Sequence, residues 1–220
     1  MKTMSNPNYI KARKMASEIL LLQEDLVFPI DVEKIKLKDK SIVFSSYKNY
    51  AEKTGISVSD LNPDGKYNDA MVYSCSVNEK LILYNSEIHS KGRILWNKAH
   101  ELGHIVLDHK EQGELEEIEA NTFASQLLLP QCLLKALIQN DLKVTSDYIV
   151  AKFGLSTAAA DSCLRLVRNK LENDYDATYD DIILFKCKDF LSNETKKNIR
   201  SHYYDDDISD EERNNWLNEL

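Results

Sequence analysis

The feature that most constrains this chain is a five-residue stretch, His100-Glu101-Leu102-Gly103-His104, in a segment whose apolar spacing predicts a helix. Residues four positions apart lie about 40° apart around a helix, so the two imidazoles can converge on one cation. Glu101 projects from the flank of this pair, where a carboxylate can reach a metal-bound water without being a ligand. This arrangement is typical of zinc hydrolases. The alternative, two solvated histidines, is weaker, because the pattern arises by chance in about one chain in a hundred.

Length and composition place this motif in an ordinary folded domain. The 220 residues suit one domain, or one domain with a smaller appendage, and 43% hydrophobic residues can fill a core. No stretch reads as a secretory h-region and no apolar stretch approaches the roughly 20 residues that span a bilayer, so we expect a cytoplasmic protein. The cysteines are isolated singles, which indicates reduced core thiols: Cys75, Cys132, Cys163 and Cys187.

Helical and strand periodicities predict an α+β fold that is mainly helical with a small sheet. Helices are expected at residues 8–24, 31–35, 47–54, 90–109 and 115–129. One strand is expected at 41–45, and a β-hairpin from 70–76 and 81–85 across a short polar link. Asn62-Pro63-Asp64-Gly65 has the composition of a turn. Ser90 is a suitable N-cap for the helix that carries the motif.

A catalytic zinc usually takes three protein ligands, so one ligand must lie outside the motif. The metzincin pattern would place a glycine three residues after the second histidine and a third histidine three residues further on. Leu107 and Lys110 stand at those positions, which excludes that class. The remaining nearby candidates are His109, Glu116, Glu117 and Glu119.

The expected chain reversal favours one of these candidates. If the two helices fold antiparallel about a turn centred near residues 111–112, Glu119 faces His104 across the pair. Glu116 shares a helical face with Glu119 and remains an alternative. His109 follows His104 by five residues on the same expected helix, so we interpret it as a polar helix end. The acidic cluster also fits an ordinary helix N-terminus, where carboxylates are favoured.

Two stretches together resemble the ImmA/IrrE family of metallopeptidases. They are residues 100–104 (HELGH) and residues 119–130 (EANTFASQLLLP), and the hairpin before them and Phe153-Gly154-Leu155-Ser156 after them fit the same layout. The resemblance covers roughly residues 8–170. It implies a gluzincin-like minimal zincin core with one zinc ion per chain. His100, His104 and Glu119 would then be the zinc ligands, and Glu101 the catalytic base.

The resemblance also implies a substrate and a mechanism. Members of the family cleave or inactivate a transcriptional repressor of a phage, mobile element or stress regulon, so the expected partner is a protein and the expected activity is endopeptidase. Zinc lowers the pKa of its bound water to about 7, and Glu101 accepts the proton as that water attacks a peptide carbonyl. One departure is that Phe123 stands where larger gluzincins place an aspartate, four residues after the ligand glutamate. The group that orients the histidines therefore stays open.

A second functional hypothesis concerns residues 144–171, which resemble a helix-turn-helix. DNA binding would use Lys152, Arg165, Arg168 and Lys170. The segment that would enter the groove opens with Thr157-Ala158-Ala159-Ala160-Asp161, which offers few side chains that read bases. We therefore favour a helical lid packed on the catalytic core. A third hypothesis is a regulatory protein that binds a repressor or toxin partner without proteolysis.

These observations divide the chain into three parts. Residues 1–140 form the zincin-like domain, residues 141–171 the helical segment packed on it, and residues 172–220 an acidic extension of unknown role. The extension holds 14 acidic against 6 basic residues, whereas residues 1–171 carry 22 of each sign, so it accounts for the whole net charge of −8. A neutral body with an acidic tail disfavours nonspecific binding to phosphates. No membrane partner is expected.

Overall fold

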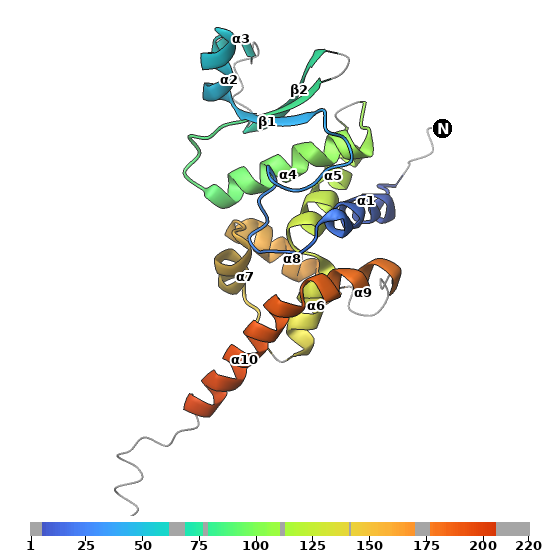
Figure 1. Cartoon of the computed structure of the whole chain (residues 1–220), viewed down its shortest axis with the longest axis vertical. Coiled ribbons are helices and arrows are strands. Elements are labelled where there is room, and N and C mark those ends of the chain that lie inside the picture. The colour runs from blue at the N-terminus through green and yellow to red at the C-terminus, as the bar shows by residue number, and fades with distance from the viewer. Residues whose placement is uncertain are drawn as a thin grey trace, which may run out of the picture.

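The structure is a computed structural model that describes residues 6–61, 69–76, 79–110, 113–140, 142–169 and 177–205. Within these ranges the chain forms ten helices and one three-stranded sheet, which confirms a mainly helical α+β fold. The sheet lies against one side of helix α4 (Lys91–Leu107), and most other helices gather on the opposite side (Figure 1). The turn expected at Asn62–Gly65 lies outside the described residues. No described helix has the length and apolar run needed to cross a membrane.

The sheet has the strand order β1-β3-β2. Strands β2 (Ala70–Ser76) and β3 (Glu79–Tyr84) form the predicted antiparallel hairpin. Strand β1 (Ile42–Ser46) pairs parallel to β3, with Phe44 opposite Ile82. Strand β3 is therefore central, which explains why its residues 81–83 are buried. The hairpin's other strand, β2, forms a sheet edge and contacts α4.

Helix α4 begins as expected and ends earlier than expected. The Ser90 hydroxyl caps it by accepting a hydrogen bond from the Arg93 N–H. The helix was expected to reach His109 but ends at Leu107, because Asp108 adopts a left-handed conformation with φ 60°. The N–H of residue 109 then donates to the carbonyl of residue 104, and that of residue 108 to the carbonyl of residue 105. This pair of bonds is a Schellman motif, which turns the chain sharply after the helix.

Helix α5 (Glu114–Leu128) runs back along α4. The two helices approach closely at Gly103, where an added Cβ would lie 3.0 Å from a ring carbon of Phe123 and 3.3 Å from the Cα of Ala120. A larger residue at position 103 would hold α5 away from α4. Gly103 of the HELGH stretch therefore sets the distance between the two helices that carry the candidate ligands.

Helix α1 (Tyr9–Leu22) packs against α4 and α5, and the turn after it leads into β1. The short helix expected at residues 31–35 forms only a turn. Helices α2 (Tyr47–Thr54) and α3 (Val58–Leu61) follow β1 and enclose a small apolar cluster with the sheet. Figure 1 shows them at the outer end of the sheet, away from the helical body.

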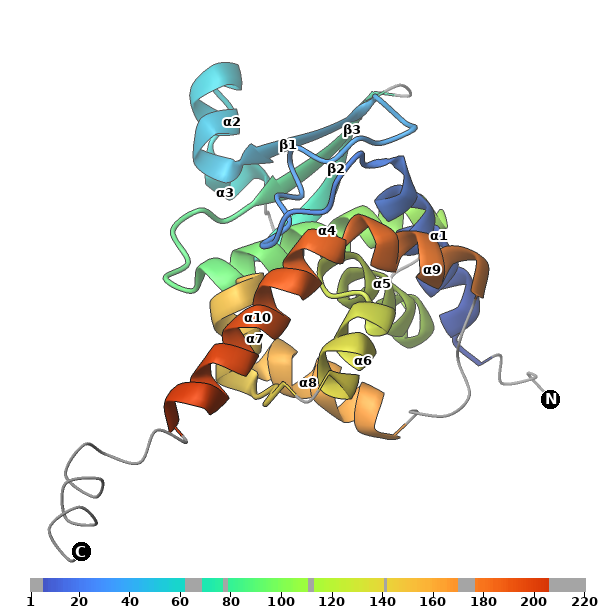
Figure 2. The same cartoon turned by 60° about the horizontal axis from the view of Figure 1, so that its bottom comes forward.

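The C-terminal helices share one hydrophobic core with α4 and α5. They are α6 (Gln131–Gln139), α7 (Ser146–Phe153), α8 (Thr157–Asn169), α9 (Ala177–Lys186) and α10 (Lys188–Asp205). The core includes Leu102, Phe123, Phe153 and Ile183, all fully buried. Helix α9 contacts α1, and α10 runs along the outside past α7 (Figure 2). The helix-turn-helix-like segment is thus part of the same core as the helix that carries the motif.

Candidate metal centre

The two histidines of the motif converge as their spacing requires. Nε2 of His100 and Nε2 of His104 lie 3.0 Å apart, one turn from each other on α4. The carboxylate of Glu117, on the first turn of α5, lies 3.2 Å from Nε2 of His100 and 3.3 Å from Nε2 of His104. Among the described residues these three groups are placed to hold one metal ion.

The group fits a zinc ion in both geometry and chemistry. Ligands about 2.0–2.2 Å from a tetrahedral zinc lie roughly 3.3–3.5 Å from each other, close to the separations found here. Burial lowers the pKa of His100. Burial, and then electrostatic repulsion from the nearby His100, lower the pKa of His104. Both imidazoles are therefore neutral at pH 7, the form that binds metal. The Glu117 side chain is 46% exposed, so the group opens to solvent on the α5 side.

The structure brings Glu117 to the histidines, whereas the sequence favoured Glu119. Glu119 lies on another face of α5, where Oε1 accepts a 2.7 Å hydrogen bond from the backbone N–H of Asn8 and Oε2 lies 3.0 Å from Nε2 of His109. Burial raises the pKa of Glu119, but the bonds from Asn8 and His109 outweigh it and hold that pKa below its usual value. The alternative Glu116 lies against Gly113 at the start of its own helix.

The difference follows from the early end of α4. Because the Schellman motif reverses the chain after Leu107, α5 returns one residue sooner than a turn centred near residues 111–112 would allow. Two residues along a helix correspond to a rotation of about 200°, so Glu117 and Glu119 point to nearly opposite sides. Residues 111–112 themselves lie outside the described part of the chain.

Asn121 orients His100, and sequence reasoning missed it. Its Oδ1 lies 3.1 Å from Nδ1 of His100 and accepts a 3.2 Å hydrogen bond from the indole N–H of Trp96. Asn121 stands four residues after Glu117, so the sequence does contain a Glu-x-x-x-Asn form of the gluzincin pattern. The sequence therefore contained this pattern, but taking Glu119 as the ligand directed attention to Phe123, four residues further on, instead of to Asn121.

His109 contacts the second histidine of the motif. Its Nδ1 lies 2.9 Å from Nδ1 of His104, and its side chain is only 7% exposed. The interpretation of His109 as a polar helix end is therefore wrong. The reason is again the left-handed Asp108, which returns the next residue toward the last turn of α4 rather than extending the helix.

Glu101 is held at the junction of α4 and the sheet edge. Its carboxylate accepts a hydrogen bond from the backbone N–H of Val72 on β2. Burial, and then the negative charge of Glu117, raise the pKa of Glu101 to about 7. A carboxylate with this pKa exchanges a proton near neutral pH, as a general base does. A bound cation would lower that pKa.

The edge strand is attached to α4 by side chains from the first half of the helix. Asp69, which precedes β2, is hydrogen bonded to the guanidinium of Arg93 and accepts a 3.2 Å bond from the amide of Asn97. Its backbone carbonyl accepts a 2.8 Å bond from the N–H of Asn85 after β3. These contacts fix the position of β2 relative to the two histidines.

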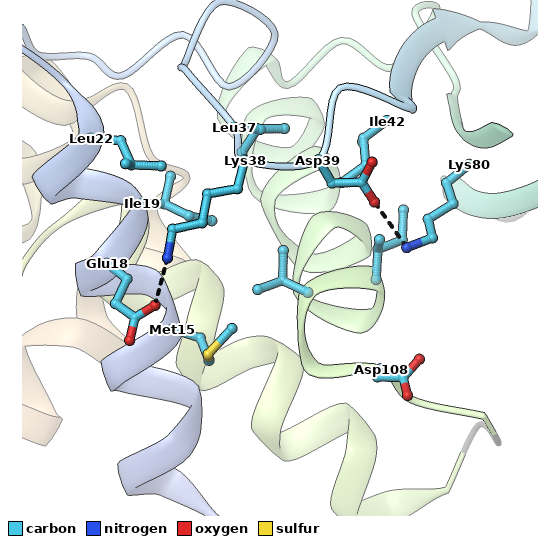
Figure 3. A pocket seen from close by; sticks show the side chains of 12 residues that line it. Met15, Glu18, Ile19, Leu22, Leu37, Lys38, Asp39, Ile42, Lys80 and Asp108 are labelled. Atoms are coloured by element: carbon cyan, nitrogen blue, oxygen red, sulfur yellow. Dashed lines mark hydrogen bonds and ion pairs between the residues drawn. The ribbon is translucent and has the colours of Figure 1, made fainter. Parts of the chain in front are cut away.

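Two of the cavities in the described part of the chain flank α4, and neither is lined by His100, His104 or Glu117. A cavity of about 350 Å³ is lined by apolar residues of α1, α4 and the chain before β1, with the ion pairs Lys38–Glu18 and Lys80–Asp39 at its rim (Figure 3). Its lining includes Ile105 and Val106 of α4 but none of the candidate metal ligands. A cavity of about 580 Å³ lies between α4, α5 and α8, and its lining includes Trp96 and Asn121, which contact each other beside His100.

The basic residues proposed for DNA binding are partly engaged in the structure. Lys152 donates a 2.7 Å hydrogen bond to Glu194 of α10, a carboxylate that is 7% exposed. Arg165 contacts Ser162 of its own helix. The side chain of Arg168 and all of Lys170 lie outside the described residues. Lys152 therefore ties α7 to α10, which weakens the DNA-binding hypothesis.

Comparison with known proteins supports the metal-site interpretation. A family model described as Peptidase_M78, IrrE N-terminal-like domain, matches residues 51–165, which include α4, α5 and the whole metal centre. No curated protein matches the chain. The matched range begins after α1, so the contact of Asn8 with Glu119 involves a segment before it.

Proposed function

Because the chain belongs to the IrrE N-terminal-like (M78) family of metallopeptidases, we propose that it is a zinc-dependent endopeptidase that cleaves a specific protein. The observation that carries this proposal is the convergence of His100, His104 and Glu117 within 3.0–3.3 Å of one another. These three residues would hold one zinc ion per chain, with Glu117 in the place that the sequence assigned to Glu119. Glu101 would be the catalytic base.

The residues of the chain divide the reaction between them. When bound, zinc supplies Lewis-acid chemistry and lowers the pKa of a coordinated water to about 7. Glu101 takes up the proton of the attacking water and delivers it to the leaving amine. The hydrogen bond from the Val72 N–H orients the Glu101 carboxylate while it does so. Asn121 keeps the proton of His100 on Nδ1, which leaves Nε2 free to bind the metal.

The edge strand beside Glu101 supports an extended peptide as the substrate. β2 pairs with β3 on one side only, so its other edge can accept a substrate strand through main-chain hydrogen bonds. The 580 Å³ cavity next to Trp96 and Asn121 can take side chains of that strand. Such a site selects a segment that is already extended or easily unfolded. In keeping with the family resemblance, we propose a helix-turn-helix transcriptional repressor as the substrate.

The experiment measures metal content, cleavage and biological effect with the full-length protein. Metal analysis is expected to find one zinc per chain in the wild type. The Glu101→Gln variant is expected to keep the zinc and to leave a repressor encoded beside this gene uncleaved. Cleavage of the repressor is measured by mass spectrometry. If Glu101→Gln cleaves at the normal rate, the base assignment is wrong. If it loses cleavage but retains the biological effect, the chain acts instead as a regulatory binding protein.

The identity of the third ligand is tested by a matched pair of variants. Glu117→Gln and Glu119→Gln each remove one negative charge from the same helix. We expect Glu117→Gln to lower zinc affinity by more than the 10–100-fold typical of losing a group that only contacts a ligand. The reverse order of the two variants would restore Glu119 as the ligand.

A further inference from the structure

A hydrogen-bonded chain runs from His104 away from the metal centre. Nδ1 of His104 lies 2.9 Å from Nδ1 of His109, and Nε2 of His109 lies 3.0 Å from Oε2 of Glu119. Oε1 of Glu119 accepts a 2.7 Å bond from the backbone N–H of Asn8, the N-cap of α1. These hydrogen bonds therefore connect a candidate ligand on α4, through α5, to the N-cap of α1.

The protons of this chain can be placed in one consistent way. Binding of a cation through Nε2 requires that the proton of neutral His104 be on Nδ1. That N–H can donate only to an unprotonated Nδ1 of His109. His109 must then carry its own proton on Nε2, from which it donates to the Glu119 carboxylate. The Glu119 carboxylate accepts hydrogen bonds from both His109 and Asn8, so no donor faces a donor anywhere in this series of contacts.

We propose that His109 and Glu119 are positioning residues that hold His104 in its metal-binding tautomer and orientation. A carboxylate that supports a metal-ligating histidine is a general device, and here a second histidine extends its reach. His109 and Glu119 are 7% and 15% exposed, so water competes little for these contacts. The proposal rests on the function proposed above, because it takes His104 to be a ligand.

The same contacts make α1 part of the support of the metal centre. The Asn8 side chain caps α1 by accepting a 2.9 Å bond from the Lys11 N–H. The Lys11 ammonium donates a 3.0 Å bond to the carbonyl of Leu107, the last residue of α4. The first turn of α1 thus contacts both the end of the helix that carries the ligands and Glu119 on α5. Displacement of this turn would release Glu119, and with it the orientation of His104.

The test measures the affinity of the full-length protein for zinc by competition with a chromophoric chelator. His109→Ala and Glu119→Leu are each expected to weaken zinc binding by about 10–100-fold. Glu119→Gln should weaken it less, because its amide oxygen still accepts a bond from His109. The double variant should bind zinc about as weakly as the worse single variant, since both act through one chain of contacts.

Matched controls separate positioning from general damage. His89→Ala and Glu114→Gln change exposed residues of the same kinds, the latter on the same helix, and should leave zinc affinity unchanged. With cobalt as a spectroscopic probe, the visible absorption bands should shift in His109→Ala and Glu119→Leu but not in the controls. Loss of affinity that simply follows the melting temperature of the metal-free proteins, with unshifted cobalt bands, would overturn the proposal.

A second pair of variants tests the contact with α1. Asn8→Ala removes the capping side chain but keeps the backbone N–H that donates to Glu119. Asn8→Pro removes both, and the φ of −86° at this position lies close to the range of proline. Asn8→Pro should therefore weaken zinc binding further than Asn8→Ala, and equal affinities would remove α1 from the proposal. Wild-type protein that binds no zinc refutes the proposed function, whereas tight and equal binding by every variant refutes only the positioning role.

Discussion

The contact of α4 with the turn between α7 and α8 gives a quantitative prediction for Gly92→Ala. An ideal Cβ at Gly92 would lie 2.5 Å from the carbonyl carbon of Leu155 and from the nitrogen of Ser156, and 2.8 Å from the oxygen of Gly154. Ordinary contact begins at 3.4 Å, so this turn must retreat by about 0.9 Å (3.4 − 2.5). Because these atoms belong to the backbone, no rotation of a side chain can relieve the clash.

The expected cost is the difference of two terms. Overpacking costs about 1–3 kcal/mol, and a rigid backbone neighbour favours the upper end of that range. Alanine gains up to about 1 kcal/mol over glycine inside a helix. We therefore expect Gly92→Ala to lower the free energy of unfolding by about 2 kcal/mol. For a chain of this size the melting temperature should fall by roughly 4–8 °C.

Urea unfolding and thermal melting of the wild type and two variants provide the measurement. Gly55→Ala is the matched control, because an added Cβ there meets no atom within 4 Å and only the φ of +73° opposes it. That conformation costs about 1–2 kcal/mol and is confined to the end of α2. Stability of Gly92→Ala within 0.5 kcal/mol of the wild type would refute the close packing of the helix-turn-helix-like segment on the motif helix.

Three further predictions concern other contacts. Asn121→Leu should weaken zinc binding by about 10–100-fold, whereas Asn121→Asp keeps the acceptor for His100 and should retain the metal, as chelator competition can measure. Phe153→Ala should cost about 3–5 kcal/mol in urea unfolding, because this ring is fully buried against Phe28 and Phe190. Burial raises the pKa of Glu194, but hydrogen bonds from Lys152, Lys197 and Tyr148 outweigh it and hold this pKa below the ordinary 4.5. The ionised Glu194 carboxylate therefore stabilises the fold fully above pH 4.5, and this stabilisation is lost as the pH falls through the lower pKa of the folded state. Glu194→Gln should therefore flatten the acid limb of a stability-against-pH curve.

Much of this architecture is determined by short-range patterns that a sequence displays directly. The helical spacing and the Ser90 cap identified α4, and two β-rich runs across a short polar link identified the β2–β3 hairpin. The parallel pairing of β1 with β3 was not predictable in the same way. Partners separated by a long crossover leave no local signal, because either edge of the hairpin could accept the strand.

The third candidate ligand shows how a small local event can change a site. A left-handed residue at a helix end is usually glycine, so Asp108 gave no reason to end α4 at Leu107. When the centre of the turn moves by one residue, the residue of α5 that faces His104 changes by two positions, from Glu119 to Glu117. The prediction of His100 and His104 does not depend on this turn, because both residues lie on one helix. A residue supplied by a neighbouring helix depends on the turn between them.

The position of α1 has a consequence for when the metal centre can form during synthesis. Its Leu20 is fully buried in the common core, its N-cap supports Glu119, and the ammonium of Lys186 bonds to carbonyl oxygens at its C-terminal end. These partners leave the ribosome long after α1 does. A growing chain that already contains His100 and His104 therefore lacks the finished support of the site until residues near 186 have emerged. Such an order would keep the proposed zinc site from binding its metal tightly before then.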